Sequence, residues 1–239
     1  MTRPSNKSSV HDLEKIIGYV FKNRALLAEA LTHKSFFHEN SGSVVTYNER
    51  LEFLGDSVIG LIIVEYIFHL KQRYSESVLA KMKSYLVCET VLAGIATSLS
   101  LGKYIMLGKG EEATGGRDKK SILADALEAL VGAVFLDAGF EQTRDLVLHF
   151  MRVSIDCAIE SGDFYDYKTE LQEKTQLLYG LLPEYRLVRE QGMEHNRTFT
   201  VSVYLDNRKL GTASGQRKKE AETIAAKKAL DKIRLQTGE

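Results

Sequence analysis

The sequence predicts a two-domain fold, in which an all-α domain over residues 10–159 precedes a small α+β domain over residues 168–236. Apolar residues recur at helical spacing through the first part. Strand-like runs begin only after Pro183, and the last part has the order α-β-β-β-α. A short, turn-rich stretch (ESGDFYDY) lies between the two parts, and we interpret it as a linker over residues 160–167.

Helices account for the first domain, and their predicted ranges are 12–19, 24–32, 48–70, 78–100, 121–136 and 142–159. The segment 48–70 is long and largely apolar, as expected of a core helix. The segment 78–100 is predicted as one continuous helix. The charged, glycine-rich segment 108–120 is predicted as a loop, and Ser121 as the N-cap of the helix after it.

The second domain is predicted to contain a helix at 168–179, strands at 184–190, 198–205 and 209–213, and a last helix at 218–234. The middle strand alternates with period two, which is typical of a half-buried strand. Its apolar face carries Phe199, Val201, Val203 and Leu205. The inner face of the last helix is expected to carry Ala221, Ile224, Ala225, Ala229 and Ile233.

Composition narrows the class of protein. The chain has 32 basic and 32 acidic residues, so its net charge is zero, but residues 166–239 contain 14 basic against 11 acidic residues. Such asymmetry fits a binding module joined to a carboxylate-rich module.

The two cysteines show no zinc-binding spacing, and we expect no organic cofactor. The longest apolar run is too short and too interrupted to span a membrane, and we expect a cytoplasmic protein.

Acidic residues form two stripes at helical spacing. Glu49, Glu52 and Asp56 are spaced i, i+3 and i+7, and Asp125 and Glu128 are spaced i and i+3 in a second helix. A glycine follows the last acid of each stripe by four residues, at positions 60 and 132. We expect these two glycines to let the helices approach closely, so that their carboxylates converge.

Converging carboxylates repel one another and are disfavoured by burial, and a bound hard cation relieves both effects. Ligands that are all oxygen favour Mg²⁺, with Mn²⁺ as a substitute. Such an ion can polarise a phosphate and activate a water molecule. The alternative is that these acids are surface charges paired with Lys or Arg, and the spacing alone leaves both interpretations open.

Three sequence motifs resemble those of the bacterial ribonuclease III family. NERLEFLGD at 48–56 is similar to the family's signature, and LTHKSF at 31–36 and SILADALEALVGAVFLD at 121–137 are similar to two further motifs. The resemblance implies a helical endonuclease domain followed by a double-stranded-RNA-binding domain. It also implies a homodimer that cleaves double-stranded RNA to 5′-phosphate and 3′-hydroxyl ends, with precursors of ribosomal RNA and other structured transcripts as substrates.

The resemblance also implies roles for individual residues. The metal ligands correspond to Glu52, Asp56, Asp125 and Glu128. Asp56 and Glu128 are the expected catalytic residues, with Glu128 between the metal and the scissile phosphate. Glu49 and Glu76 are expected to orient the ligands from a second layer, although Glu49 also fits an RNA contact or an ordinary helix-surface charge. Phe53 corresponds to the dimer contact, although it also fits an ordinary core aromatic.

Contacts to RNA are expected from both domains. GQRKKEAETIAAKKAL at 215–230 resembles the last motif of the double-stranded-RNA-binding fold, and a phosphate is favoured where basic residues gather at a helix N-terminus. Alternatively, Glu220 and Glu222 offset these charges. The expected contacts at this N-terminus are Arg217, Lys218 and Lys219, and the resemblance implies further contacts by Thr169, Gln172, Glu173, His195 and Asn196. Before the second acidic helix, the candidates are Arg117, Lys119 and Lys120. The last three also fit a solvated surface loop.

Two departures from the family pattern affect the last motif: Arg217 replaces a frequent Ser or Thr, and Ala213 replaces a usual glycine. A rival function is a non-catalytic protein that binds double-stranded RNA on the same fold. A protein that had lost catalysis would usually lack one of the acids, and none is missing here.

Overall fold

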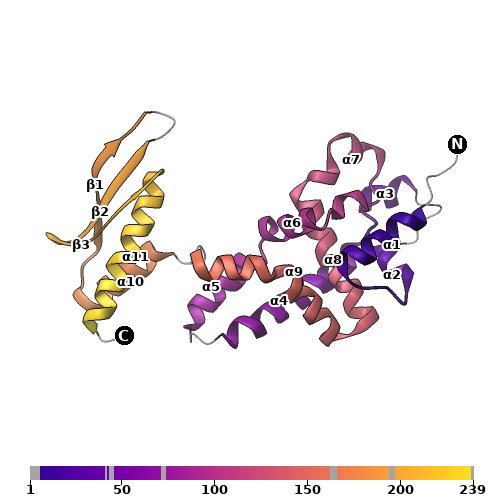
Figure 1. Cartoon of the computed structure of the whole chain (residues 1–239), viewed down its shortest axis with the longest axis horizontal. Helices are drawn as coiled ribbons and strands as arrows, with labels where there is room; N and C mark the ends of the chain where they lie inside the picture. The colour runs from indigo at the N-terminus through magenta and orange to yellow at the C-terminus, as the bar shows by residue number, and fades with distance from the viewer. Residues whose placement is uncertain are drawn as a thin grey trace. The chain divides into compact units, whose positions relative to one another are not determined.

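The computed structural model describes residues 6–40, 42, 46–70, 74–161, 166–193 and 197–237, without the side chains of 6–9, 161 and 237. The chain divides into two compact units, Met1–Phe164 and Tyr165–Glu239. The first is helical and the second has the order α-β-β-β-α, which confirms the predicted fold class (Figure 1). Residues 160 and 161 belong to a helix and 167 begins the next one, while residues 162–165 of the predicted linker lie outside the described residues.

The first unit is built around one central helix, α8 (Lys120–Ala138), which is packed against α2, α4, α6 and α9. Apolar side chains cover most of its circumference, and buried residues run from Ile122 to Val134. A helix that is apolar on all sides must be covered by other helices. The elements around it are α1 (Asn6–Ile17), α2 (Arg24–Ala30), α3 (Lys34–Glu39), α4 (Glu49–Phe68), α5 (Glu76–Leu86), α6 (Glu89–Ser98), η1 (Leu101–Lys103), α7 (Lys109–Ala113), η2 (Gly116–Asp118) and α9 (Phe140–Ser161).

Three details of the predicted helical pattern are wrong. The segment 78–100 is two helices, because α5 ends at Leu86 and α6 begins at Glu89. The segment 108–120 is a short helix followed by a 3₁₀ turn rather than a loop. Ser121 does not cap α8, since the N-cap position is Lys119 and no side chain caps it. Helix α3 and turn η1 are elements that the sequence pattern did not predict.

Helices α4 and α8 approach closely at two glycines. A Cβ on Gly55 would lie 1.8 Å from the carbonyl oxygen of Glu128, and a Cβ on Gly132 would lie 2.3 Å from that of Leu51. The helices are therefore antiparallel at this contact. The predicted role of Gly132 is confirmed, but that of Gly60 is wrong, because a Cβ there would only touch the Lys83 side chain at 3.5 Å.

The second unit is a three-stranded antiparallel sheet in the order β1-β2-β3, with two helices packed on one face (Figure 1). Its elements are α10 (Tyr167–Tyr179), β1 (Pro183–Gln191), β2 (Thr198–Leu205), β3 (Arg208–Gly215) and α11 (Lys218–Thr237). The register runs from Pro183 opposite Leu205 to Gln191 opposite Thr198, with an irregularity between Leu187 and Arg189.

A core of its own stabilises this unit. Val201 and Val203 of β2 are fully buried, and Leu205 nearly so, as the alternation predicts. Val203 and Leu205 pack with Leu171 of α10 and with alanines of α11. Ser202 on the opposite face is also buried, and a hydrogen bond to the hydroxyl of Thr212 at 2.7 Å satisfies its own hydroxyl.

No helix in the described part of the chain combines the length and the apolar character needed to cross a membrane.

Candidate metal centre and RNA-binding surfaces

Three carboxylates converge where α4 crosses α8. Glu52, Asp125 and Glu128 each offer a carboxylate oxygen, and these oxygens lie within 4.8 Å of one another. All three side chains are half-buried. The close backbone approach at Gly55 and Gly132 brings them together, because it places the first turn of α4 beside the middle of α8.

Asp56, the fourth predicted ligand, lies on the same helix one turn after Glu52 and is exposed. Its carboxylate is outside the group of three. Its charge nevertheless acts on that group, since after burial it is the largest cause of the raised pKa of Glu128. The structure thus brings three of the four predicted ligands into direct proximity, with the fourth at their edge.

The electrostatics of this cluster reflect unbalanced negative charge. Burial, and then the charges of Asp56, Asp125 and Glu52, raise the pKa of Glu128 to about 8. Burial and the neighbouring acids also raise the pKa values of Glu52 and Asp125. Half-buried carboxylates that repel one another hold protons more tightly until positive charge replaces the protons.

Sequence reasoning missed two charged residues at this site. Glu89, in the first turn of α6, is the largest contributor after burial to the raised pKa of Asp125. Lys34, in the first turn of α3, donates from Nζ to a Glu49 carboxylate oxygen at 3.1 Å. Lys34 lies within the LTHKSF motif, so a signal for it was available. Glu89 has none, because the packing of α6 against α8 is a tertiary contact.

The two acids predicted to orient the ligands differ in position. Glu49 is paired with Lys34, and its charge raises the pKa values of Glu52 and Asp125. Glu76 is exposed in the first turn of α5. Among the described residues, it is not one of the charges that shift the pKa values of the three converging carboxyls.

The basic residues before α8 are mostly engaged within the protein. Arg117 donates from one guanidinium nitrogen to the carbonyl oxygens of Gly102 and Ile105, both at 2.8 Å, and from another to Glu112 at 2.6 Å. Its side chain therefore fastens the 3₁₀ turns to each other. An RNA contact by Arg117 would compete with these bonds.

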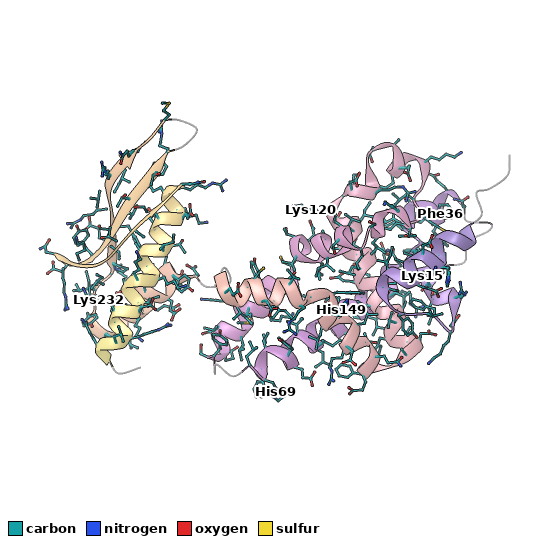
Figure 2. All side chains as sticks on the ribbon, in the orientation of Figure 1. Lys15, Phe36, His69, Lys120, His149 and Lys232 are labelled. Carbon is teal, nitrogen blue, oxygen red and sulfur yellow. The ribbon has the colours of Figure 1, made fainter. Side chains whose placement is uncertain are left out.

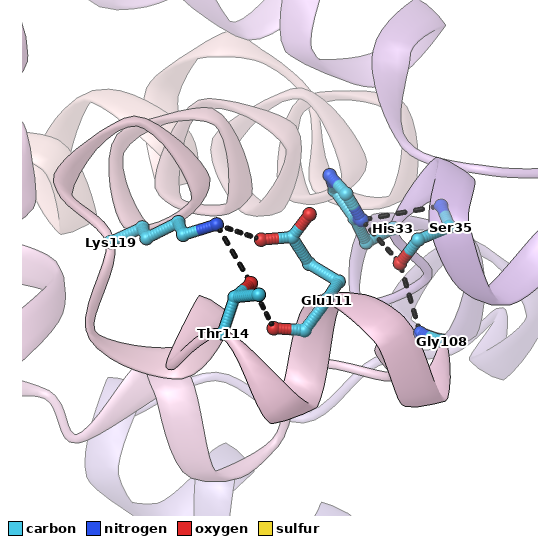
Figure 3. A network of polar contacts seen from close by, with 6 residues as sticks. All are labelled: His33, Ser35, Gly108, Glu111, Thr114 and Lys119. Atoms are coloured by element: carbon cyan, nitrogen blue, oxygen red, sulfur yellow. Dashed lines mark hydrogen bonds and ion pairs between the residues drawn. The ribbon is translucent and has the colours of Figure 1, made fainter.

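Lys119 also has partners within the protein. Its ammonium donates to Glu111 at 2.6 Å and to Thr114 at 3.0 Å, and Figure 3 shows Glu111 between Lys119 and His33. Lys120, labelled in Figure 2, is exposed at the start of α8. In the described part of the chain its side chain has no ion-pair partner, so of the three it is the one available to a phosphate.

In the second unit, the predicted contacts on α10 lie on its exposed side. Thr169, Gln172 and Glu173 are exposed, whereas Leu171 and Thr175 of the same helix are buried. The hydroxyl of Thr169 donates to the N-cap residue Asp166 at 2.7 Å. His195 and Asn196 lie outside the described residues.

Basic side chains are exposed at the N-terminus of α11. Arg217, Lys218 and Lys219 are all exposed there. Glu220 accepts from the backbone N–H groups of Gln216 and Arg217, at 2.9 and 3.3 Å. Glu222 instead accepts from Lys168 on α10 at 2.7 Å. Only one of the two acids that could offset this basic group therefore lies against it.

Phe53 is not a core aromatic, because 79% of its surface is exposed on α4. Leu61 and Phe68 of the same helix are 58% and 70% exposed. Spaced eight and fifteen residues after Phe53, they lie on one helical face. Apolar side chains gathered on one exposed face are typical of an interaction surface.

Comparison with known proteins identifies both units. The family model described as Ribonuclease-III-like matches residues 23–154, more than half of the chain. The chain belongs to the ribonuclease III family. The model of the double-stranded RNA binding motif matches residues 167–233. A ribonuclease III that carries this motif is an endoribonuclease acting on double-stranded RNA, and the predicted activity is confirmed.

Relatives match along almost the whole length. Ribonuclease 3 of Caldanaerobacter subterraneus is 46% identical, over 92% of this chain and 96% of that protein. Ribonuclease 3 of Clostridium beijerinckii is 44% identical, over 95% and 97%. The nuclease domain of ribonuclease III from Campylobacter jejuni has a similar fold, with a TM-score of 0.56, 44% identity, and coverage of 60% of this chain and 96% of that one. In that protein a flexible region is described as involved in dimer formation.

Proposed function

We propose that this endoribonuclease hydrolyses duplex RNA with Mg²⁺ bound by Glu52, Asp56, Asp125 and Glu128, and that Mn²⁺ substitutes for Mg²⁺. The three converging carboxylates carry the proposal, because their oxygens fit one cation and their raised pKa values indicate unmet negative charge. Hard oxygen donors without sulfur or nitrogen favour Mg²⁺. The residues present therefore fit the ion that the family uses.

When bound, the ion supplies polarisation of the scissile phosphate and activation of water. The protein's own contribution is position and charge. Of the three carboxyls, Glu128 has the most strongly raised pKa, and three acids contribute to that shift. It therefore suits a place between the cation and the phosphate. Asp56, exposed at the edge of the group, suits orientation of the attacking water. Hydrolysis would give 5′-phosphate and 3′-hydroxyl ends without a covalent protein intermediate.

RNA would be held by side chains from both units. The proposed contacts are Thr169, Gln172, Glu173, His195, Asn196, Arg217, Lys218, Lys219 and Lys120, with Arg117 and Lys119 as weaker candidates because of their internal partners. Recognition of this kind senses the shape of A-form RNA more than its sequence. Ribosomal RNA precursors and other structured transcripts are suitable substrates, and their processing would occur in the cytoplasm.

A homodimer completes the proposal. The exposed apolar face of α4, which carries Phe53, Leu61 and Phe68, supplies a surface for a second copy. Each cluster would then meet one strand of the duplex. A non-catalytic RNA-binding protein is the rival function, and the complete set of acids argues against it.

The decisive experiment compares cleavage and binding in Glu128→Gln. This change removes a ligand charge but keeps the shape and the RNA-binding surfaces. We expect cleavage of a long RNA duplex to fall by roughly 100-fold or more, with duplex binding unchanged in a gel-shift assay. Glu141→Gln is the matched control, because Glu141 is an exposed glutamate on α9.

Single-stranded RNA and EDTA provide two further arms of the experiment. Cleavage of the duplex should exceed that of single strands and should stop when EDTA removes the metal. Normal cutting by Glu128→Gln, or cutting that survives EDTA, would show that the metal centre is wrongly assigned.

A further inference from the structure

A lysine lies among the acids of the metal centre. The Nζ of Lys34 is 3.1 Å from a Glu49 carboxylate oxygen, and the two side chains are 56% and 46% exposed. The charge of Lys34 also lowers the pKa values of Glu52 and Asp125, against the raising effect of burial. Glu49 and Glu52 share the first turn of α4, so the contact with Glu49 holds the ammonium beside the helix end that carries Glu52.

The backbone around Lys34 is anchored on both sides. The N–H of His33 donates to the carbonyl oxygen of Met106 at 3.1 Å, and His33 Nδ1 accepts from the N–H of Ser35 at 3.2 Å. The hydroxyl of Ser35 accepts from the N–H of Gly108 at 2.9 Å. Figure 3 shows the bonds of Ser35 to His33 and to Gly108, the second of which joins the start of α3 to the residue before α7. The first turn of α3 is thus held in place with Lys34 between two fixed neighbours.

We propose that Lys34 is the built-in counter-cation of the metal-free centre and that it weakens divalent-cation binding there. The inference rests on the proposed function, because it concerns the same carboxylates. An ammonium beside repelling carboxylates stabilises them while no metal is bound. The same charge repels a divalent ion that approaches those carboxylates. Lys34 thereby raises the Mg²⁺ concentration at which the centre fills.

The contrasting possibility is an inert surface ion pair. Exposed pairs of this kind often contribute little to stability, because water and salt screen them. An inert pair would leave metal affinity unchanged when the lysine is removed. A lysine that instead held Glu49 ready for the metal would make affinity weaker when removed. Removal of Lys34 should therefore raise the metal affinity if the lysine repels the ion, leave it unchanged if the pair is inert, and lower it if the lysine positions Glu49.

The test is calorimetric titration of the full-length protein with MnCl₂, with Lys34→Met as the main variant and Lys34→Gln as a second neutral replacement. Both remove the charge at a side chain that is more than half exposed, so folding should be retained. We expect Mn²⁺ to bind on the order of tenfold more tightly in both variants. Without metal, both should melt at a lower temperature than the unaltered protein.

Two controls separate charge from other effects. Lys34→Arg keeps the positive charge and should bind Mn²⁺ as the unaltered protein does. Lys15→Met removes a charge from the exposed side of α1 and should also leave the affinity unchanged. Equal or weaker Mn²⁺ binding by Lys34→Met and Lys34→Gln would overturn the inference and leave the proposed function standing. No Mn²⁺ binding by the unaltered protein would overturn both.

Discussion

Glu128 combines burial with the repulsion of three neighbouring acids. Both effects disfavour its charged form, and its pKa is raised to about 8 as a result. Near neutral pH the carboxyl of the metal-free protein is therefore largely protonated. A cation that binds the carboxylate must displace this proton, so metal affinity is linked to pH.

This linkage gives the first prediction. Mn²⁺ affinity should fall as pH decreases below about 8, by up to about tenfold for each pH unit, because one proton must leave. Titrations in buffers that differ in ionisation enthalpy should detect the released proton. Glu128→Gln removes the titrating group, so its residual Mn²⁺ binding should release fewer protons. Affinity that does not vary between pH 6 and pH 8 would contradict this prediction.

The same raised pKa affects stability with a definite sign. A carboxyl whose pKa is higher in the folded than in the unfolded state stabilises the fold fully at pH values below the unfolded pKa. That contribution is lost as pH rises toward the folded value of about 8. Melting temperatures of the metal-free protein should therefore decline across this interval, and the decline should be smaller in Glu128→Gln.

At the scale of elements, the crossing of α4 and α8 shows what sequence patterns can and cannot predict. The spacing of the acids correctly indicated two carboxylate-bearing faces that meet. It also suggested Gly60 and Gly132 as the contact, but the observed contact uses Gly55 and Gly132. Gly55 follows Glu52 by three residues and Gly60 follows Asp56 by four, so both glycines stand at helical spacing from an acid. Which one faces α8 depends on the rotation of α4 against all its neighbours, and that is a property of the packed fold.

Substitutions at glycines test this crossing. Gly55→Ala should destabilise the protein by about 1–3 kcal/mol or more, because the added Cβ would meet the backbone of α8 at 1.8 Å. The helices must then separate, and the carboxylates with them, so Mn²⁺ affinity should also fall. Urea denaturation and calorimetry measure the two effects.

Gly94→Ala is the matched control. Gly94 is exposed within α6, and an added Cβ there would have nothing within 4 Å. Alanine favours the helix over glycine by about 0.5–1 kcal/mol, so this variant should be more stable than the unaltered protein. If Gly55→Ala were equally well tolerated, the close crossing would not be what positions the site.

The break between α5 and α6 was not predictable from pattern alone. Neither Val87 nor Cys88 is a residue that usually ends a helix, and Cys88 provides no side-chain cap. Apolar residues on both sides, such as Leu86 and Leu92, are buried in one core. The hydrophobic repeat therefore continues across the bend, and it reports burial rather than a continuous helix axis.

The segment before α8 yields a prediction that separates structure from RNA binding. Arg117→Met should lower stability by about 1–3 kcal/mol, because two carbonyl oxygens and Glu112 lose their donor. Lys120→Met should change stability by less than about 0.5 kcal/mol. It should instead weaken duplex binding and reduce the slope of affinity against salt by about one charge.

Thermal melting and salt-dependent gel-shift titrations distinguish the two residues of that segment. If the Arg117→Met variant is fully stable but binds RNA weakly, then Arg117 binds phosphate in preference to its partners within the protein. If Lys120→Met binds RNA as the unaltered protein does, the segment is a solvated surface and not an RNA contact.

At the scale of the whole molecule, motif order predicted more than any local pattern did. Two acidic motifs followed by a basic helix N-terminus indicated both modules, and both are present. Glu89 was missed because it reaches the site from α6 through a tertiary contact, and Lys34 on α3 was missed although it stands in the LTHKSF motif. The two acidic motifs name residues on the helices that cross. The charges that tune those residues come from elements that only the folded chain brings near.

The assembly of two copies is the largest-scale prediction. Phe53, Leu61 and Phe68 leave an apolar face of α4 in water, and burial of such a face against its own copy would be favourable. Phe53→Asp places a charge at the most exposed of these positions. It should raise the dimer dissociation constant by about 30-fold or more, as expected for an aromatic anchor contributing about 2 kcal/mol.

Sedimentation equilibrium measures this change, and Val20→Asp provides the control, because Val20 is an exposed apolar residue that follows α1 and is not part of α4. Two clusters held in one dimer would cut both strands of a duplex in a single encounter. Separated subunits would leave nicks, since each cluster meets only one strand. Phe53→Asp should therefore convert paired cuts into single-strand nicks at protein concentrations where the unaltered protein is dimeric. A variant that stays dimeric and makes paired cuts would move the interface away from α4.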